Sequence, residues 1–391
     1  MTSIREVIRR FFTPNEPIPS GTYQYQAPPE SQQPYRLHLR IEPDGHGVLI
    51  VNASIVLHLN NTATEYAYHL IKKTDTDQAA REIASRYRIK PTEAQKDFDE
   101  FVERIQELIH TPDLDPIAYL DFDRHTPYSQ DISAPYRLDC AITYTLPAST
   151  NPDFAPVKRV DRELETDEWK LILDKAWDAG VPHVIFTGGE PTLRDDLPEL
   201  IRHAESIGQV SGLLTDGIQF SDSPYLDEIL QTGLDHIMVV FQPGNMQNET
   251  ALRNLISADI ALIVHLTITP ENASRASSWV DRFAEMGIEK ISLSTTNPEM
   301  RNTISQIHNQ AIDLGLSLIW DLPVPYSSNN PISLEVVEEQ LTEGAGKGWL
   351  YVEPDGDVLP AQGINQVLGN IIRDPWELIW DRAKAAWSKP S

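Results

Sequence analysis

The stretch His183-Val-Ile-Phe-Thr-Gly-Gly-Glu-Pro-Thr-Leu-Arg-Asp-Asp-Leu-Pro198 decides the fold of the larger part of the chain. Its apolar run Val184–Phe186 has the composition of a short buried strand. Gly188 and Gly189 follow, and without side chains they let a ligand come close to the backbone. Glu190 then places a carboxylate at the carboxyl end of the strand, where ligands of α/β folds bind.

Alternating strand and helix patterns surround this stretch. Pro191 ends the strand pairing, and the acidic residues from Asp195 suit the start of a helix. Strands are expected at Arg137–Thr145, His183–Thr187, Val210–Thr215, His236–Phe241, Ala261–Thr269, Lys290–Ser294 and Ser317–Trp320. Helices are expected at Asp167–Ala179, Asp195–Ile207, Ser223–Gln231, Glu249–Ala258, Asn272–Met286 and Asn302–Leu314. This alternation predicts parallel strands with right-handed crossovers, in an α/β barrel or a doubly wound sheet.

A different pattern precedes the alternation. Strand patterns at Tyr35–Ile41, Val48–Val51 and Ser54–Leu59 are followed by helical patterns at Ala63–Ile71, Thr76–Tyr87 and Thr92–Ile109. They predict a small antiparallel sheet with three helices. The expected parts are a lead (1–20), a first domain (21–112), a proline-rich linker (113–135), the barrel (136–343) and a C-terminal region (344–391) with a turn at Pro354–Asp357.

The composition restricts the classes of function. A chain of 391 residues favours two domains, and a hydrophobic content of 40% allows a sizeable core. A net charge of −26 argues against nucleic acid and anionic membrane surfaces as partners. No apolar run reaches the length of a membrane span, and the N-terminal segment lacks the pattern of a signal peptide. A soluble cytoplasmic protein is therefore expected.

Polar residues follow two neighbouring strands of the predicted barrel. Strand ends on one face of a barrel converge on a single site. A carboxylate beside two glycines suits an amino group, and a Thr-Asp-Gly turn suits a ribose, so a small-molecule pocket is expected here. The predicted ligand-binding residues are Gly188, Gly189, Glu190, Pro191, Thr215 and Asp216.

The motif Thr187-Gly-Gly-Glu-Pro191, with Leu214-Thr-Asp-Gly217 one strand later, resembles the radical S-adenosylmethionine (SAM) family. In that family the Gly-Gly-Glu-Pro motif holds the amino group of SAM, and a Thr-Asn-Gly turn often follows the next strand. Asp216 stands here in place of that asparagine. The resemblance implies a partial (β/α)6-type TIM barrel, SAM as a ligand and a [4Fe–4S] cluster.

Both ends of the chain carry further resemblances. Leu57-His-Leu-Asn-Asn-Thr-Ala63, Ile83–Tyr87 and a long helix with Asp97 and Phe101 resemble the PqqD-like peptide-recognition domain, a small winged-helix-like α+β fold. Such domains bind a precursor peptide as an added strand. The alternative is an ordinary winged-helix domain, whose usual nucleic-acid role the acidic charge disfavours. Similarity to the SPASM extension of peptide-modifying radical enzymes covers Trp349–Pro360, Leu368–Ile371 and Pro375–Trp380.

The cysteines that these resemblances imply are missing. The family's Cys-x3-Cys-x2-Cys loop, placed after Ile142-Thr143, falls on Leu146, Thr150 and Asp153, and Ala361 stands where the SPASM pattern has a cysteine. The single cysteine, Cys140, lies inside the predicted first strand, where a free cysteine is usually a small buried hydrophobe. Iron–sulfur clusters are held by cysteine thiolates. The sequence therefore does not support the cluster or the radical reaction that depends on it.

Three functions remain open. The favoured one is a non-catalytic, radical-SAM-like pseudoenzyme that binds a precursor peptide or pairs with an active radical enzyme. The second is a binder of SAM or a related nucleoside near Glu190 and Thr215. The third is an enzyme with cluster-independent chemistry at the barrel mouth, from Glu190, Asp216 or His265. His265 lies in an apolar strand, as satisfied core histidines do, and neither a Ser–His–Asp set nor a metal-binding histidine cluster is evident. No catalytic residue and no metal ligand is assigned.

Overall fold

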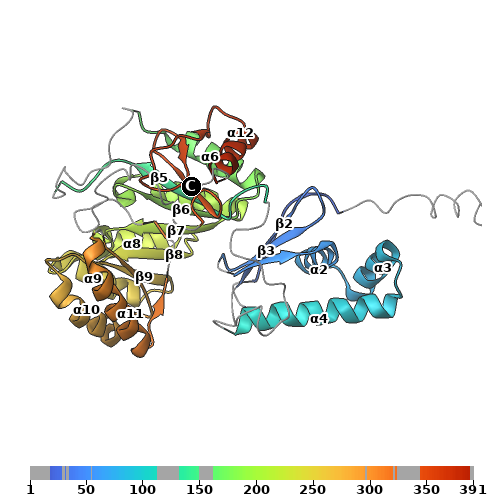
Figure 1. Ribbon diagram of the computed structural model, residues 1–391, viewed down its shortest axis with the longest axis horizontal. Coiled ribbons are helices and arrows are strands. Elements are labelled where there is room, and N and C mark those ends of the chain that lie inside the picture. Colours follow the sequence, from blue (N-terminus) through green and yellow to red (C-terminus); the bar gives the residue numbers. More distant parts are fainter. Residues whose placement is uncertain are drawn as a thin grey trace, which may run out of the picture. The chain divides into compact units, whose positions relative to one another are not determined.

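The computed structural model describes residues 18–28, 31, 35–53, 55–111, 132–148, 162–295, 297–319, 322–323 and 344–387. The chain forms two compact units, Met1–Ser133 and Ala134–Ser391 (Figure 1). Most of the predicted lead (1–20) and linker (113–135) lies outside the described residues. None of the described helices is long and apolar enough to cross a membrane.

The N-terminal unit is an antiparallel sheet with three helices gathered on one side of it (Figure 1). Its strands lie in the order β1 (Gly21–Gln26), β2 (Arg36–Ile41), β3 (Gly47–Val51) and β4 (Ile55–Leu59). The helices are α2 (Asn61–Ile71), α3 (Thr76–Tyr87) and α4 (Pro91–His110). The predicted strands and helices are confirmed, whereas β1 was not predicted. It is an edge strand of sequence GTYQYQ with no fully buried residue, and it contains no aliphatic side chain that would mark a half-buried strand.

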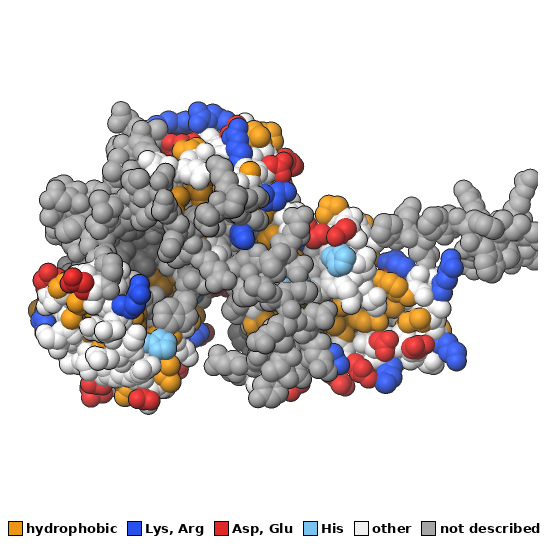
Figure 2. All heavy atoms as spheres, in the orientation of Figure 1, with side chains coloured by type: hydrophobic (Ala, Val, Ile, Leu, Met, Phe, Trp, Pro, Cys, Tyr) orange, Lys and Arg blue, Asp and Glu red, His pale blue; other side chains and the backbone are white. Residues whose placement is uncertain are grey.

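Local sequence explains where these helices begin and which side they bury. The Asn60 side chain caps α2 by accepting a hydrogen bond from the backbone of Ala63 at 2.9 Å. In α4 the spacing of Phe98, Phe101 and Ile105 produces one apolar side, and all three are buried in the core of the unit. Figure 2 shows acidic and basic side chains along the outer edge of this unit, over α4.

The second unit is built on a parallel sheet. Its strands are β5 (Arg137–Thr143), β6 (His183–Gly188), β7 (Val210–Thr215), β8 (His236–Val240), β9 (Ala261–Thr267), β10 (Lys290–Ser294) and β11 (Ser317–Leu318). They neighbour one another in chain order, and every adjacent pair is parallel. The connecting helices are α6 (Thr166–Asp178), α7 (Leu197–Ile207), α8 (Ser223–Leu230), α9 (Met246–Ile256), α10 (Ala273–Met286) and α11 (Arg301–Asp313). This confirms the predicted α/β fold of the partial-barrel type.

The C-terminal region extends the same sheet beyond β5. Strand β12 (Trp349–Val352) is parallel to β5, and β13 (Asp357–Leu359) and β14 (Gly369–Asn370) follow in antiparallel pairs. The predicted Pro354–Asp357 turn joins β12 to β13, with Gly356 at φ +85°. The chain then forms α12 (Trp376–Trp387).

One face of the parallel sheet carries an apolar layer. The buried side chains of Ile185, Leu214, Met238, Val240 and Ile263 pack together there, from four neighbouring strands. Because alternate residues along a strand point to the same side, His265 and Thr267 share the face of Ile263 but lie nearer the carboxyl end of β9. The residues after the strand ends therefore converge above this layer.

Candidate functional site

The glycine pair at the end of β6 brings two strand ends together. A Cβ on Gly188 would lie 2.4 Å from the carbonyl oxygen of Thr143, and one on Gly189 would lie 2.1 Å from that of Thr145. The amide of Gly189 donates to Thr143 O at 2.8 Å, and the amide of Glu190 donates to Thr145 O at 2.7 Å. The missing side chains thus let the ends of β5 and β6 approach closely, and the ligand-binding role of these glycines stays a prediction.

The carboxylate of Glu190 is the centre of a hydrogen-bond network. Its side chain is buried, and Oε1 accepts from the amide of Thr192 at 3.0 Å, the hydroxyl of Thr192 at 2.5 Å and the hydroxyl of Thr215 at 2.6 Å. Its Oε2 accepts from the backbone amide of Asp216 at 2.7 Å. The structure therefore brings Glu190, Thr215 and Asp216 together, as the sequence predicts. Pro191 begins a short 3-10 turn, Pro191–Leu193, and the next helix begins at Leu197 rather than at the predicted Asp195.

Asp216 is held at the end of β7 by a neighbour that the sequence does not reveal. Its Oδ1 accepts from the amide of Ile218 at 2.9 Å, and its carbonyl accepts from Asn248 Nδ2 at 2.7 Å. Asn248, fully buried at the start of α9, also donates to Val240 O and accepts from the amide of Gln242. One amide side chain thereby joins the ends of β7 and β8.

Glu190 and Asp216 form a pair of neighbouring buried acids. Among the described residues, no lysine or arginine makes an ion pair with either side chain. Burial raises the pKa of Glu190 to about 8, with the Asp216 charge as the next cause. Burial also raises the pKa of Asp216. An ionised carboxylate has about four acceptor positions, and Oε2 of Glu190 uses only one within the described residues. The pair therefore has room for a proton or for a cationic group.

Tyr225, on α8, is a further candidate that sequence reasoning missed. Its hydroxyl is buried and has no hydrogen-bond partner among the described residues. Burial raises the pKa of this phenol, and the nearby Glu190 charge raises it further. Buried polar groups are nearly always hydrogen-bonded, so an orphan donor beside an acid pair indicates a place for a ligand or water. No sequence signal distinguishes Tyr225, because an isolated tyrosine near the start of a helix is common.

The residues present do not fit a [4Fe–4S] cluster. Cys140 is fully buried within β5, and burial raises the pKa of its thiol, which disfavours the thiolate that iron requires. Leu146 has no metal-ligating atom, and the other two predicted loop positions, Thr150 and Asp153, lie outside the described residues. Ala361 is buried. The described residues also contain no group of His, Cys, Asp and Glu side chains arranged to hold a metal ion.

Protein hydrogen bonds fasten the chain where the cluster loop would begin. The carboxylate of Glu163 accepts from the Thr143 hydroxyl at 2.9 Å and from the Tyr144 amide at 2.7 Å. The Tyr144 hydroxyl donates to the carboxylate of Glu353, in the turn after β12. Two acids from distant parts of the sequence thus hold the end of β5 in place without iron.

His265 is enclosed by hydroxyl groups. Its Nδ1 lies 3.1 Å from Ser292 Oγ, and its Nε2 lies 2.9 Å from Ser294 Oγ and 3.2 Å from Thr267 Oγ1. Burial lowers the pKa of His265 to about 3, so the imidazole is neutral at physiological pH. An imidazole with so low a pKa is a weak base, and both of its ring nitrogens already have hydroxyl partners, which agrees with its interpretation as a satisfied core residue.

Comparison with known proteins supports this architecture. Residues 140–257 match the model of the radical SAM superfamily. This segment of the chain is similar to that superfamily. PqqA peptide cyclase from Xanthomonas oryzae pv. oryzae is 26% identical over 258 residues, which cover 57% of this chain and 67% of that protein. PqqA peptide cyclase from Streptomyces rochei is 25% identical over 285 residues, covering 64% of this chain and 76% of that protein.

Solved structures extend the likeness to the N-terminal unit. Streptococcus suis SuiB bound to its precursor peptide SuiA has a TM-score of 0.57 at 15% identity, covering 88% of this chain and 86% of that one. SuiB bound to SAM has the same TM-score and identity, covering 90% and 87%. At this identity the likeness concerns the fold, and it confirms the expected combination of an N-terminal α+β domain with a partial barrel. The relatives' described partners are peptides and SAM.

Proposed function

We propose that this chain is a radical-SAM-like protein that has lost its cluster ligands and acts by binding a peptide rather than by radical chemistry. One observation carries the proposal: the whole sequence has a single cysteine, and it is buried inside β5. Three thiolates are needed to hold the family's cluster, and without it no low-potential electron is available to cleave SAM. The barrel would then serve as a scaffold or as a partner of an active radical enzyme.

The N-terminal unit is the proposed peptide-binding part. Strand β4 pairs with β3 on one side and with no other strand among the described residues. An edge strand of this kind has backbone groups that an extended peptide can pair with. The relatives named PqqA peptide cyclase and SuiB bound to precursor peptide SuiA add support, because their names connect this architecture with peptides.

A second candidate function, binding of SAM without cleaving it, rests on the acid pair. Glu190 and Asp216 are buried, lack a cationic partner among the described residues, and leave acceptor capacity on Glu190 Oε2. The ammonium group of SAM would supply the missing positive charge. Glu190 would hold that group, and the neighbouring Thr215 would fix the position of the carboxylate through its 2.6 Å hydrogen bond. This function is compatible with the first.

The proposed function is tested with the full-length chain and the short peptides encoded beside its gene. Each peptide is titrated by fluorescence anisotropy, and then incubated anaerobically with the protein, SAM and a strong reductant. We expect saturable binding of one peptide, no cleavage of SAM and no change in peptide mass. Failure of every neighbouring peptide to bind would refute the peptide function, and SAM cleavage or a modified peptide would refute the non-catalytic role.

A further inference from the structure

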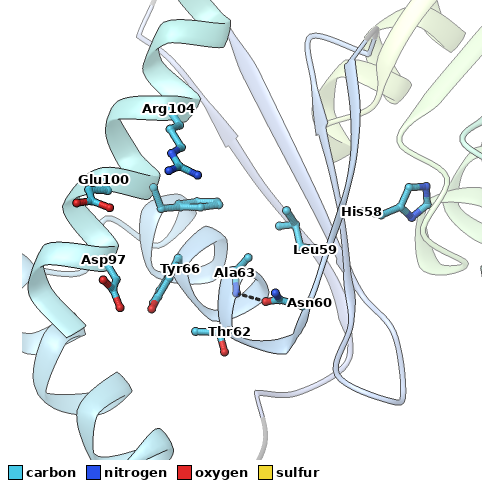
Figure 3. Close-up of a pocket in the computed structure, with 10 residues that line it drawn as sticks. His58, Leu59, Asn60, Thr62, Ala63, Tyr66, Asp97, Glu100 and Arg104 are labelled. Carbon is cyan, nitrogen blue, oxygen red and sulfur yellow. Dashed lines mark hydrogen bonds between the residues drawn. The ribbon is translucent and has the colours of Figure 1, made fainter. Parts of the chain in front are cut away.

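The N-terminal unit contains a pocket between the end of β4, the start of α2 and the middle of α4. Its volume is about 300 Å³. Leu59 lines it from β4, Tyr66 from α2, and Asp97, Phe101 and Arg104 from α4 (Figure 3). Residues 97, 101 and 104 are three to seven positions apart on one helix, and such spacing places side chains on the same side. The pocket is thus a feature of one compact unit and is built by regular elements.

Charge is distributed unevenly within the pocket. Figure 3 shows Arg104 at one end and Asp97 near the opposite end, with the hydroxyl of Tyr66 directed toward the Asp97 end. The acid at the Asp97 end has no ion pair with any described lysine or arginine. An unpaired carboxylate in a partly enclosed pocket attracts a positively charged group.

Tyr66 supplies a second polar group to the Asp97 end of the pocket. Its side chain is 7% exposed, and its ring packs against Phe98 and Phe101, with centroid distances of 6.2 and 5.7 Å. Its hydroxyl is not among the fully buried oxygen atoms of the described residues that lack a hydrogen-bond partner, and Tyr66 lines the pocket. Burial, and after it the charge of Asp97, raises the pKa of Tyr66 to about 12, so the hydroxyl stays protonated. A protonated phenol can accept a hydrogen bond from a cationic group that enters the pocket.

Strand geometry connects this pocket with the edge of β4. A peptide added beside β4 would run past Leu59 toward the pocket, and its alternate side chains would point toward the helix side of the sheet. The ring of Phe101 forms one wall of the pocket, and aromatic rings interact favourably with cations. A long basic side chain could therefore lay its aliphatic part along the ring and its charged end near Asp97.

We propose that this pocket receives a lysine or arginine side chain of the bound peptide, so that Asp97 and Tyr66 make the unit selective for peptides with a basic residue at one fixed position. The inference rests on the proposed peptide-binding function and adds the chemistry of its specificity. Asp97 supplies the opposite charge, Tyr66 the hydroxyl and Phe101 the aromatic wall.

Selection from a phage-displayed library of random dodecapeptides against the immobilised full-length protein tests the inference. The enriched peptides should share a lysine or arginine at one position, and replacing it with norleucine should weaken binding about tenfold or more, the loss expected for one charge-assisted hydrogen bond. The Asp97→Asn variant should bind the unmodified peptide more weakly than wild type does, by a similar factor. The norleucine peptide should bind the variant and the wild type equally well. Asp99→Asn, which makes the same charge change on an exposed position of α4, is the matched control and should leave affinity unchanged.

The outcomes separate the two proposals. Peptides that bind without a shared basic residue, and equally well to the Asp97→Asn variant, would overturn the cation pocket but leave peptide binding intact. A library that yields no binding peptide would overturn both. The norleucine peptides need no altered protein, so their result stands even if Asp97→Asn folds poorly.

Discussion

Glu190→Gln should remove a pH dependence that the buried acid pair imposes on the stability of the barrel. The pKa of Glu190 is raised from its ordinary 4.5 to about 8, mainly by burial and then by the Asp216 charge. The native state therefore holds a proton that the unfolded state has released throughout this pH window. Stability contributed by the protonated acid is full below pH 4.5 and is lost as the pH rises toward 8.

The size of the effect follows from the same shift. Each pKa unit corresponds to about 1.4 kcal/mol, so wild type should lose on the order of 5 kcal/mol relative to the variant between these limits. The variant should also lose stability by an amount that does not depend on pH, because the glutamine amide has only one acceptor oxygen in place of two. In wild type the Asp216 amide donates to one of these two oxygens. The pH-dependent part of the difference is therefore the quantity to measure.

Urea titrations followed by tryptophan fluorescence at pH 5, 6, 7, 8 and 9 measure it directly. All eight tryptophans lie within residues 134–391, so this signal reports on the barrel unit alone. Glu285→Gln, on an exposed position of α10, is the matched control and should follow wild type at every pH. A stability difference between wild type and Glu190→Gln that stays constant from pH 5 to 9 would refute the account of the acid pair.

Three further predictions concern the same strand ends. If SAM binds through its ammonium group, its affinity measured by calorimetry should rise by at most about tenfold per pH unit up to pH 8. The Glu190→Gln variant should not show this rise. Equal binding of SAM by the wild type and the variant would mean that Glu190 is not part of the site. Asn248→Ala should lower the free energy of unfolding by about 1–3 kcal/mol, because Asp216 O loses its buried donor; a neutral result would mean that water replaces the amide. Gly189→Ala should destabilise the barrel or prevent its folding, because the new Cβ would lie 2.1 Å from Thr145 O. A Tm within 2 °C of wild type would contradict this close packing.

Much of the fold could be predicted from the sequence because it depends on local periodicity. The predicted strand Val210–Thr215 coincides with β7, and the predicted helix Thr76–Tyr87 coincides with α3. Glycines, prolines and capping residues mark most of the other ends to within a few positions. Strand β1 lacks such a signal, since its side chains are neither regularly apolar nor buried.

The candidate site was predictable only in part. Glu190, Thr215 and Asp216 could be placed together because consecutive parallel strands end at the same edge of a sheet. The contact of Tyr144 with Glu353 joins residues 209 positions apart, and that of Asn248 with Asp216 spans 32, so no local pattern reveals either. The ligand-binding role of the Gly-Gly-Glu-Pro residues stays a prediction, and their structural role in joining β5 to β6 emerged only from the backbone distances.

The absence of a functional cluster site is the central claim, and anaerobic iron–sulfur reconstitution tests it most directly. The purified full-length chain is incubated with iron, sulfide and a thiol reductant, desalted, and assayed for bound iron, acid-labile sulfide and visible absorption. The Cys140→Ser variant serves as the control for nonspecific iron. We expect far less than one [4Fe–4S] cluster per chain and no difference between the two proteins. Close to four iron and four sulfide per chain, with a stable cluster absorption band, would contradict the account.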